Sequence, residues 1–313
     1  MKYDIITLGG AVVDAFVEMD VAKKNGMLSF PADEKMLMKD LDFYTGGGGT
    51  NTAAAFSKMG LKTGCIAELG RDNNAEIILK ELKKFNVDFL GTRGKEPTGF
   101  SVILTGRGKS RTILQKKGAN ETLSFRELNL SKLKTKWFYF SSSIGETLKT
   151  QKKLSSWARK RGIKIAYNPS SYLTKQGARN LRGLLRNVDV LILNKEEASD
   201  LVGKRSFSGL HALGPKIVCI TDGANGNQAS DGKKIYFVGA RKIKVVERTG
   251  AGDAFASGFV ACLIKTGKIE DAVRIGSLNA ESVIKIRGAK NGLLGWGRAR
   301  REMGKIKVKI GKL

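Results

Sequence analysis

The residues best suited to chemistry lie in one short segment, 245–260. The Gly-Ala-Gly run 250–252 precedes an almost wholly apolar segment, 254–264, which predicts a helix buried on every side. Unpaired backbone amides and the positive end of the helix dipole make such a helix start attractive to anions. A carboxylate at that point makes sense if Asp253 takes a proton from a hydroxyl that attacks a phosphoryl group held by the amides.

The same segment also has a purely structural interpretation. An ordinary glycine turn with Asp253 as the helix cap would need the same residue types. The apolar residues Val245 and Val246 read as the end of a strand that leads into the turn. A strand, a turn of small residues and a buried helix in this order favour the chemical interpretation over the structural one.

A second glycine-rich segment lies at 45–56. Its four glycines, 46–49, allow the backbone to approach a ligand closely. Asn51 then opens an alanine-rich helix that we expect to end near Gly60. The alternative is a flexible glycine linker with Asn51 as an N-cap.

Together the two segments resemble the signatures of the ribokinase/PfkB family of sugar and nucleoside kinases. The family's first signature, Gly-Gly-x-Gly-x-Asn-x-Ala, is matched at 46–53, and its second, an acidic residue before Gly-Ala-Gly-Asp, is matched at 247–253. The resemblance implies that Asp253 is the general base and that the turn of Gly250, Ala251, Gly252 and Asp253 is an anion hole for the transferring phosphoryl group.

The resemblance also implies where the acceptor binds. Gly47 and Asn51 would contact the acceptor through main-chain and amide groups. Asp14 follows a short strand that ends in a glycine pair, a place where this family holds substrate hydroxyls. A carboxylate suits that task because it accepts two hydroxyl hydrogen bonds. A surface turn residue is the structural alternative for Asp14.

Nucleotide and metal residues follow from three further matches. Asn194 and Glu197 match the Asn-x-x-Glu motif that orders Mg2+ and its waters, although an N-cap with its capping box has the same spacing, and both can be true. Thr221, Gly223 and Gly226 match the nucleotide loop Thr-x-Gly-x-x-Gly. The resemblance further suggests Asn279 as a contact of the adenine pocket.

In many relatives a monovalent cation binds near the anion hole, which would involve Glu247 and Thr249 here. Glu247 stands where relatives usually carry Asp, and Arg248 where Thr is common. A requirement for K+ is therefore open.

The elements that must position these residues alternate along the chain. Strands and helices alternate through most of the sequence, which predicts a mostly parallel sheet between helices. With the resemblance this gives a ribokinase-like three-layer α/β/α sandwich in one domain, 1–313. Partly exposed strands at about 11–45 and 98–117 would form a small β-sheet lid that excludes water from the acceptor.

Composition limits the other classes of function. The chain has 313 residues, 41% of them hydrophobic, and a net charge of +27. The charge is spread without a nucleic-acid-binding motif, so we expect no specific nucleic-acid partner. No apolar run approaches membrane-spanning length, and three unpaired cysteines suit a reducing cytoplasm.

We therefore predict a cytoplasmic, ATP- and Mg2+-dependent kinase that phosphorylates a primary alcohol of a sugar or nucleoside. A nucleic-acid-binding protein on an inactive kinase fold and a vitamin kinase of the same fold are the alternatives. The sequence leaves open which acceptor is used and whether the protein is a monomer or a homodimer joined through the lid.

Overall fold

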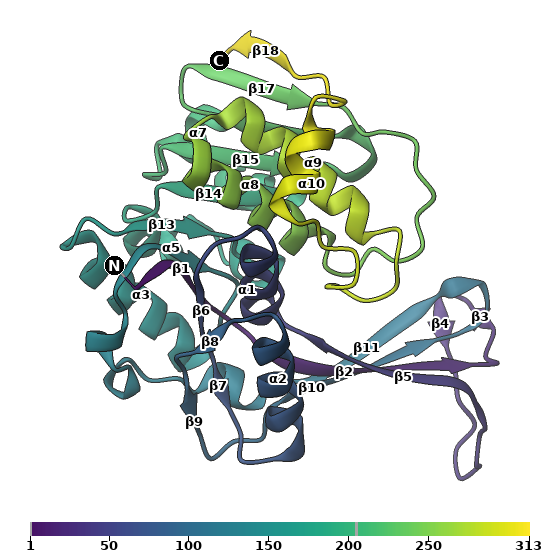
Figure 1. The fold of residues 1–313 in the computed structure, drawn as a ribbon. Coiled ribbons are helices and arrows are strands. Elements are labelled where there is room, and N and C mark those ends of the chain that lie inside the picture. Colours follow the sequence, from purple (N-terminus) through teal and green to yellow (C-terminus); the bar gives the residue numbers. More distant parts are fainter. Residues whose placement is uncertain (1, 204–205) are drawn as a thin grey trace.

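A ten-stranded sheet forms the middle of the molecule in this computed structural model, which describes residues 2–203 and 206–313 (Figure 1). Its strand order is β18-β17-β16-β15-β14-β13-β12-β1-β6-β8. The strands are β1 Tyr3–Leu8, β6 Thr63–Ile66, β8 Asp88–Phe89, β12 Thr135–Phe140, β13 Lys164–Tyr167, β14 Val190–Asn194, β15 Ile217–Thr221, β16 Asn227–Ser230, β17 Lys234–Val238 and β18 Lys309–Lys312. Neighbours from β8 to β15 pair in parallel, and β16, β17 and β18 add antiparallel pairs at one edge.

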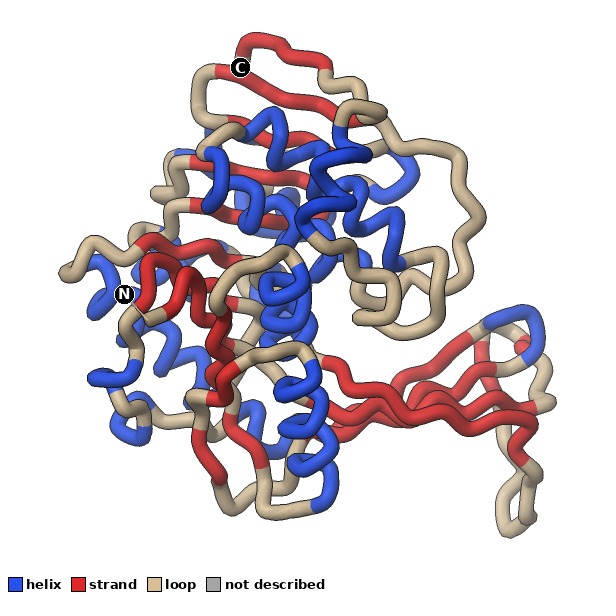
Figure 2. Tube along the Cα trace, in the orientation of Figure 1, coloured by secondary structure: helices blue, strands red, loops and turns tan. Residues whose placement is uncertain are grey.

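Helices cover both faces of this sheet (Figure 2). On β12, Phe138 and Phe140 pack into a core with one group of helices, while Trp137 and Tyr139 pack into the core on the other face. Alternate side chains of a strand point to opposite faces, so both faces of a sandwiched strand are apolar. The first group is α3 Gly145–Arg159, α5 Ala178–Leu185, α6 Lys195–Val202 and α7 Phe207–His211, and the second is α1 Gly48–Lys58, α8 Ala251–Thr266, α9 Ile269–Val283 and α10 Trp296–Met303. The three-layer prediction is confirmed.

Four further elements lie beside these layers. They are the 12-residue helix α2 Asn73–Lys84 and the short elements α4 Ser171–Thr174, β7 Glu68–Leu69 and β9 Thr92–Arg93.

Helix α8 is buried as its composition predicts, since every residue from 254 to 263 is buried. The strand predicted before it is wrong. Val245 and Val246 lie in an irregular loop and are 41% and 46% exposed. Strand β17, the preceding element, pairs with β16 on one side and β18 on the other, and the chain leaves the sheet after it. The loop amides at Val246 and Glu247 donate instead to Ile284 O.

The predicted lid is a second, four-stranded sheet in the order β11-β10-β2-β5. Its strands are β2 Val12–Met19, β5 Met38–Gly46, β10 Gly99–Thr105 and β11 Arg111–Lys116. The lid projects from one side of the body as an arm, with the small hairpin of β3 Lys23–Lys24 and β4 Met27–Leu28 at its far end (Figure 1). A mostly parallel main sheet with a small separate lid sheet confirms the predicted fold class.

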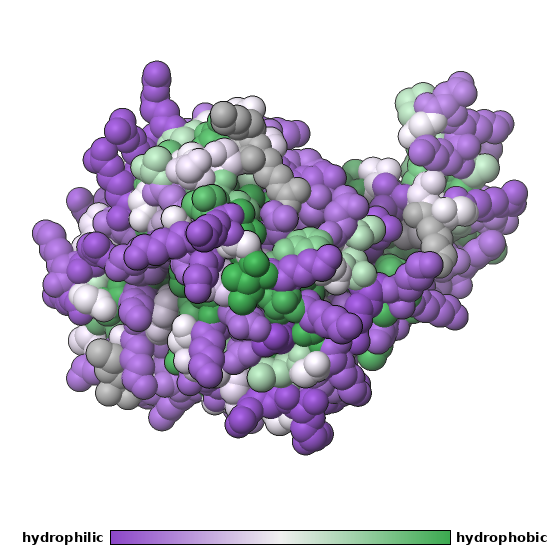
Figure 3. All heavy atoms as spheres, turned by 90° about the horizontal axis from the view of Figure 1, so that it is seen from above, coloured by the Kyte–Doolittle hydropathy of each residue, from purple (hydrophilic) through white to green (hydrophobic). Residues whose placement is uncertain are grey.

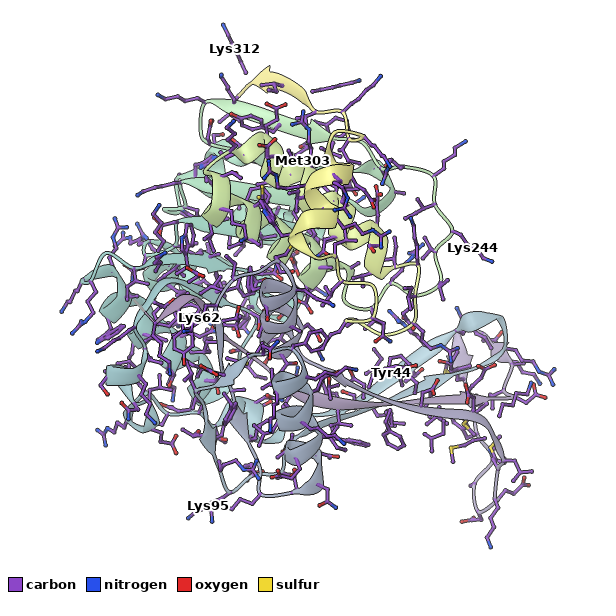
Figure 4. The ribbon with its side chains drawn as sticks, viewed as in Figure 1. Tyr44, Lys62, Lys95, Lys244, Met303 and Lys312 are labelled. Carbon is purple, nitrogen blue, oxygen red and sulfur yellow. The ribbon has the colours of Figure 1, made fainter. Side chains whose placement is uncertain are left out.

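Basic residues are spread over the molecular surface. The labelled lysines Lys62, Lys95, Lys244 and Lys312 come from different parts of the molecule (Figure 4). Hydrophilic residues dominate the face drawn in Figure 3. Within residues 2–203 and 206–313, each helix falls short of the length and apolar character that a bilayer span requires.

Candidate active site

The glycine run brings two backbone segments into direct contact. Gly47 is the N-cap of α1 with φ 93°, and a Cβ at this position would lie 2.3 Å from Gly10 O. Only glycine fits both the left-handed backbone and the contact. The helix therefore begins at Gly48, and the expectation that Asn51 opens or caps it is wrong. Asn51 lies within the first turn and is 6% exposed.

Asn51 contacts Asp253 directly, although 202 residues separate them in the chain. Its Nδ2 donates to Asp253 Oδ2 at 2.8 Å. Among the described residues, Asn51 Oδ1 is buried without a hydrogen-bond partner. The first turns of α1 and α8 thus meet at this carboxylate.

The turn before α8 has the geometry of a helix start with free amides. Gly250 is the N-cap at φ 80°, and a Cβ there would lie 2.5 Å from Ala289 Cβ. The amide of Ala251 donates to Arg248 O at 3.2 Å, so it already has a partner. The amides of Gly252 and Asp253 belong to the first helical turn and have no acceptor within the helix. This turn therefore offers two uncommitted amides, those of Gly252 and Asp253.

A single cavity of about 420 Å³ connects the predicted motifs. Asp14, Gly47, Glu197, Thr249 and Asp253 all line it. It lies beyond the carboxyl ends of the parallel strands, the usual place for ligands in such sheets. The two acids flank the glycine run, because a Cβ at residue 46 would lie 2.1 Å from Asp14 Oδ2 and one at residue 48 would lie 3.6 Å from Asp253 Oδ1.

Burial acts in the same direction on the pKa of both acids. It raises the pKa of Asp253, against the opposing effects of the Asn51 hydrogen bond and the positive charge of Lys290. Burial likewise raises the pKa of Asp14, and Ser101 and Lys290 oppose the rise. A carboxylate with a raised pKa is a stronger base than an exposed one, which suits proton abstraction near neutral pH.

Lys290 is a functional candidate that sequence reasoning missed. It is 6% exposed, and its Nζ donates to Thr45 O at 2.7 Å, to Thr45 Oγ1 at 2.6 Å and to Glu81 Oε2 at 2.9 Å. Burial lowers its pKa, while Glu81 acts in the opposite direction. Lysine is rarely buried without a strong reason. Nothing in the sequence marks it among 56 lysines and arginines.

Asn194 and Glu197 form the helix cap that their spacing predicts. Asn194 is the N-cap of α6, its Oδ1 accepts from Glu197 N, and Glu197 Oε2 accepts from Asn194 N, both at 2.9 Å. Ser171 Oγ donates to Glu197 Oε1 at 3.2 Å. Burial raises the pKa of Glu197, and these hydrogen bonds oppose the rise. The cap is confirmed, and the magnesium role stays a prediction.

The predicted nucleotide loop lies next to the start of α6. Strands β14 and β15 pair Asn194 with Thr221, and Lys195 Nζ lies 2.9 Å from Asp222 Oδ1. Thr221, Gly223 and Gly226 are not among the residues lining the cavity at Asp253.

Asn279 has a different task from the predicted nucleotide contact. Asn279 lies on α9, and its side chain is fully buried. Nδ2 donates to Ala254 O at 2.7 Å, and Oδ1 accepts from Leu294 N at 3.0 Å. Both polar groups are thus used to join α9 to α8 and to the chain before α10, which is a structural role.

Glu247 and Thr249, the residues predicted for a monovalent cation, contact a lid arginine. Arg111 Nη1 of β11 lies 3.0 Å from Glu247 Oε1 and 3.2 Å from Thr249 Oγ1. Thr249 Oγ1 also donates to Glu247 Oε1 at 2.7 Å. Sequence reasoning missed Arg111, because only the fold brings this lid strand to the loop before α8.

Ser141 was also missed, although it directly follows β12 as other site residues follow their strands. It lines the cavity, and its Oγ is buried without a hydrogen-bond partner among the described residues. A buried hydroxyl of this kind is available to a bound ligand.

Known proteins resemble this chain in sequence and in fold. A family model described as pfkB family carbohydrate kinase matches residues 11–294. A ribokinase from Haemophilus influenzae is 24% identical over 305 residues, covering 94% of this chain and 96% of that protein.

Two solved structures resemble the fold over almost the whole chain. The nucleoside kinase of Methanocaldococcus jannaschii has a TM-score of 0.82 at 21% identity and covers 97% of this chain and 99% of its own. Arabidopsis thaliana ribokinase, complexed with ribose and ATP, has a TM-score of 0.78 at 22% identity with the same coverage. The predicted enzyme class, a carbohydrate kinase, is confirmed. The chain belongs to the pfkB family of carbohydrate kinases.

Proposed function

We propose that this protein transfers the γ-phosphoryl group of ATP to a primary hydroxyl of a sugar or nucleoside. The observation that carries the proposal is the meeting of three motifs in one cavity, with Asp253 bonded to Asn51 and facing the same space as Asp14 and Gly47. A general base, a hydroxyl-binding acid and an anion site within one cavity are what such a transfer requires.

Asp253 acts as the general base in this proposal. It accepts the proton of the acceptor hydroxyl as that oxygen attacks phosphorus, and the amides of Gly252 and Asp253 hold the transferring phosphoryl oxygens. The amide of Ala251 joins them only by giving up its turn contact to Arg248 O, and Gly250 makes the turn possible.

Asp14, Gly47 and Asn51 orient the acceptor. The Asp14 carboxylate accepts hydroxyl hydrogen bonds, and the Gly47 backbone allows close approach. The amide nitrogen of Asn51 is already committed to Asp253, so its unpartnered Oδ1 is the group left to accept a hydrogen bond from the acceptor.

Glu197 fits a magnesium ion that keeps most of its waters. Its oxygens each accept one hydrogen bond from the protein and keep a second lone pair for water, and the side chain lines the cavity. When bound, the ion would neutralise ATP phosphate charge. Thr221, Gly223 and Gly226 would lie along the nucleotide, and the lid arginine Arg111 would compete with K+ at Glu247 and Thr249.

Replacing Glu197 with Gln separates the metal role from the cap. We expect Glu197→Gln to keep the acceptor for Asn194 N, and hence the melting temperature, while the Mg2+ concentration for half-maximal activity rises about tenfold. A magnesium titration of initial rates measures this. As a control, Asn194→Ala should lower stability by about 1 kcal/mol through loss of the cap. An unchanged magnesium dependence in Glu197→Gln would argue against the metal assignment.

The direct test of the function is ATP consumption across sugars, nucleosides and vitamins, with and without K+. Turnover with a sugar or nucleoside supports the proposal, and turnover with a vitamin alone favours the vitamin kinase. Binding of labelled DNA at physiological salt without any ATP turnover favours the nucleic-acid alternative. The proposal includes a cytoplasmic location, consistent with three free, buried cysteines, and a monomer or a lid-mediated homodimer, which sedimentation would distinguish.

A further inference from the structure

The lid face that lines the cavity is ordered in rows across its strands. Asp14 pairs with Ser101 on β10, and Ser101 pairs with Gln115 on β11, which makes a polar row. Two residues farther along β2, Phe16 pairs with Ile103, and Ile103 with Ile113, which makes an apolar row. All six side chains line the cavity.

We propose, on the basis of the function above, that the acceptor is a nucleoside: a ribosyl group on the polar row and a planar, largely apolar base on the apolar row. Residues two apart on a strand are about 6.6 Å apart, so the rows are spaced by about the width of one ring. The sugar end lies at Asp14, in the same cavity as Asp253, and the base lies farther out along the lid.

The polar row is equipped for hydroxyl groups. Gln115 Nε2 donates to Ser101 Oγ at 3.2 Å, and the Asp14 carboxylate stands beside that serine in the pairing. Hydroxyl, carboxylate and amide groups in one row can bind several sugar hydroxyls at once.

Two of the three side chains of the apolar row lack a cover, Phe16 and Ile113, whereas Ile103 between them is buried. Ile113 is 53% exposed although it faces the cavity, and Phe16 is only half-buried, with its ring packed edge-on against Tyr44 at 5.5 Å between centroids. Apolar surface gains stability when a ligand removes it from water. A free sugar would leave Phe16 and Ile113 bare, whereas a base would cover both and stack on the phenylalanine.

Most basic residues beyond the apolar row are paired with acids, which argues against a phosphorylated sugar: Arg287 with Asp42, and Arg107 and Lys39 with Asp20. The next row holds Glu18, Thr105 and Arg111, and Arg111 is already paired with Glu247. A phosphate placed along the lid would therefore first contact the apolar side chains of Phe16 and Ile113. It would then reach the carboxylate of Glu18 and an arginine that is already paired. Burying an uncompensated anion on such a surface is costly. Lys117, the other basic residue lining the cavity, follows the opposite end of β11.

The first test compares kcat/KM at fixed ATP for adenosine, guanosine, inosine, cytidine and uridine with that for ribose, fructose and fructose 6-phosphate. We expect at least one nucleoside to exceed every sugar and sugar phosphate by about a hundredfold or more. A sugar or sugar phosphate that equals or exceeds all nucleosides would overturn this inference and leave the kinase function standing. No ATP consumption with any of the compounds would overturn both.

The second test uses two phenylalanines of the same lid. Phe16→Ala should raise KM for the preferred nucleoside about tenfold, with KM for ATP unchanged. Phe43→Ala is the matched control, since Phe43 pairs with Ala15 on β2, is 58% exposed and does not line the cavity. We expect Phe43→Ala to leave the nucleoside KM within about twofold, because it removes no contact with the base.

A third variant guards against a misfolded lid. Ile113→Asn changes a side chain that is already exposed, so the fold should tolerate it, and it should also raise the nucleoside KM. Equal nucleoside KM values in wild type, Phe16→Ala and Ile113→Asn would contradict the placement of the base on this row.

Discussion

Asp253→Asn is expected to lower kcat at least about a hundredfold while the acceptor still binds. The amide has nearly the same size and can still accept the Asn51 hydrogen bond, but it cannot take a proton from the attacking hydroxyl. Steady-state rates measure kcat, and calorimetric titration of the acceptor measures binding separately. Loss of kcat with binding kept identifies an interaction used only in the transition state.

The matched control for this variant is Asp88→Asn. Asp88 lies on the edge strand β8, where its side chain is 56% exposed, and Asn can still accept the hydrogen bond from Tyr3 Oη. We expect its kcat to stay within about twofold of wild type, as for most surface substitutions. A kcat for Asp253→Asn close to that of this control would contradict the role of Asp253 as general base.

Lys290→Met is expected to lower the free energy of unfolding by about 2 kcal/mol, because it leaves the partly buried Glu81 carboxylate and the Thr45 groups without their donor. This loss is smaller than the roughly 3–5 kcal/mol expected for a fully buried pair, since the Glu81 side chain is 30% exposed. Urea denaturation measures the change. Adding Glu81→Gln to the variant should recover part of it, since an unpaired charge is then removed.

Lys290→Met should also move the acid limb of the pH–rate profile to higher pH. The positive charge of Lys290 lowers the pKa of both Asp14 and Asp253, so its removal raises both values. Asp253 must be deprotonated to act, so activity is lost as pH falls through its pKa, and a higher pKa means loss at higher pH. Profiles of kcat/KM against pH measure the shift.

Lys285→Met is the control for this pH effect. Lys285 is exposed and precedes Lys290 by five residues in the same part of the chain. Its charge is screened by solvent, so the acid limb should not move. If Lys290→Met unfolds easily but leaves the acid limb in place, Lys290 serves stability alone.

Local patterns in the sequence, together with the family resemblance, were sufficient for the fold class and indicated the segments that meet at the candidate site. Gly47 and Gly250 have positive φ and lie close to backbone or methyl groups, so only glycine fits at either position. In the sequence this requirement appears as a glycine directly before a helix. The apolar segment before residue 264 predicts a buried helix by composition alone. Alternation of strands and helices restricts the topology to a parallel sheet, and such a sheet collects the residues that follow its strands at one edge.

The tertiary structure alone decided which side chains share a partner. Asn51 bonds Asp253, Arg111 bonds Glu247 and Lys290 bonds Thr45 across separations of 202, 136 and 245 residues. No local propensity encodes such contacts, because they depend on how the lid and the C-terminal loop pack against the rest of the fold. The same reason explains two of the errors: Asn279 looked like a ligand contact but is buried between helices, and the apolar pair before Glu247 lies in a loop with amides that bond Ile284 O.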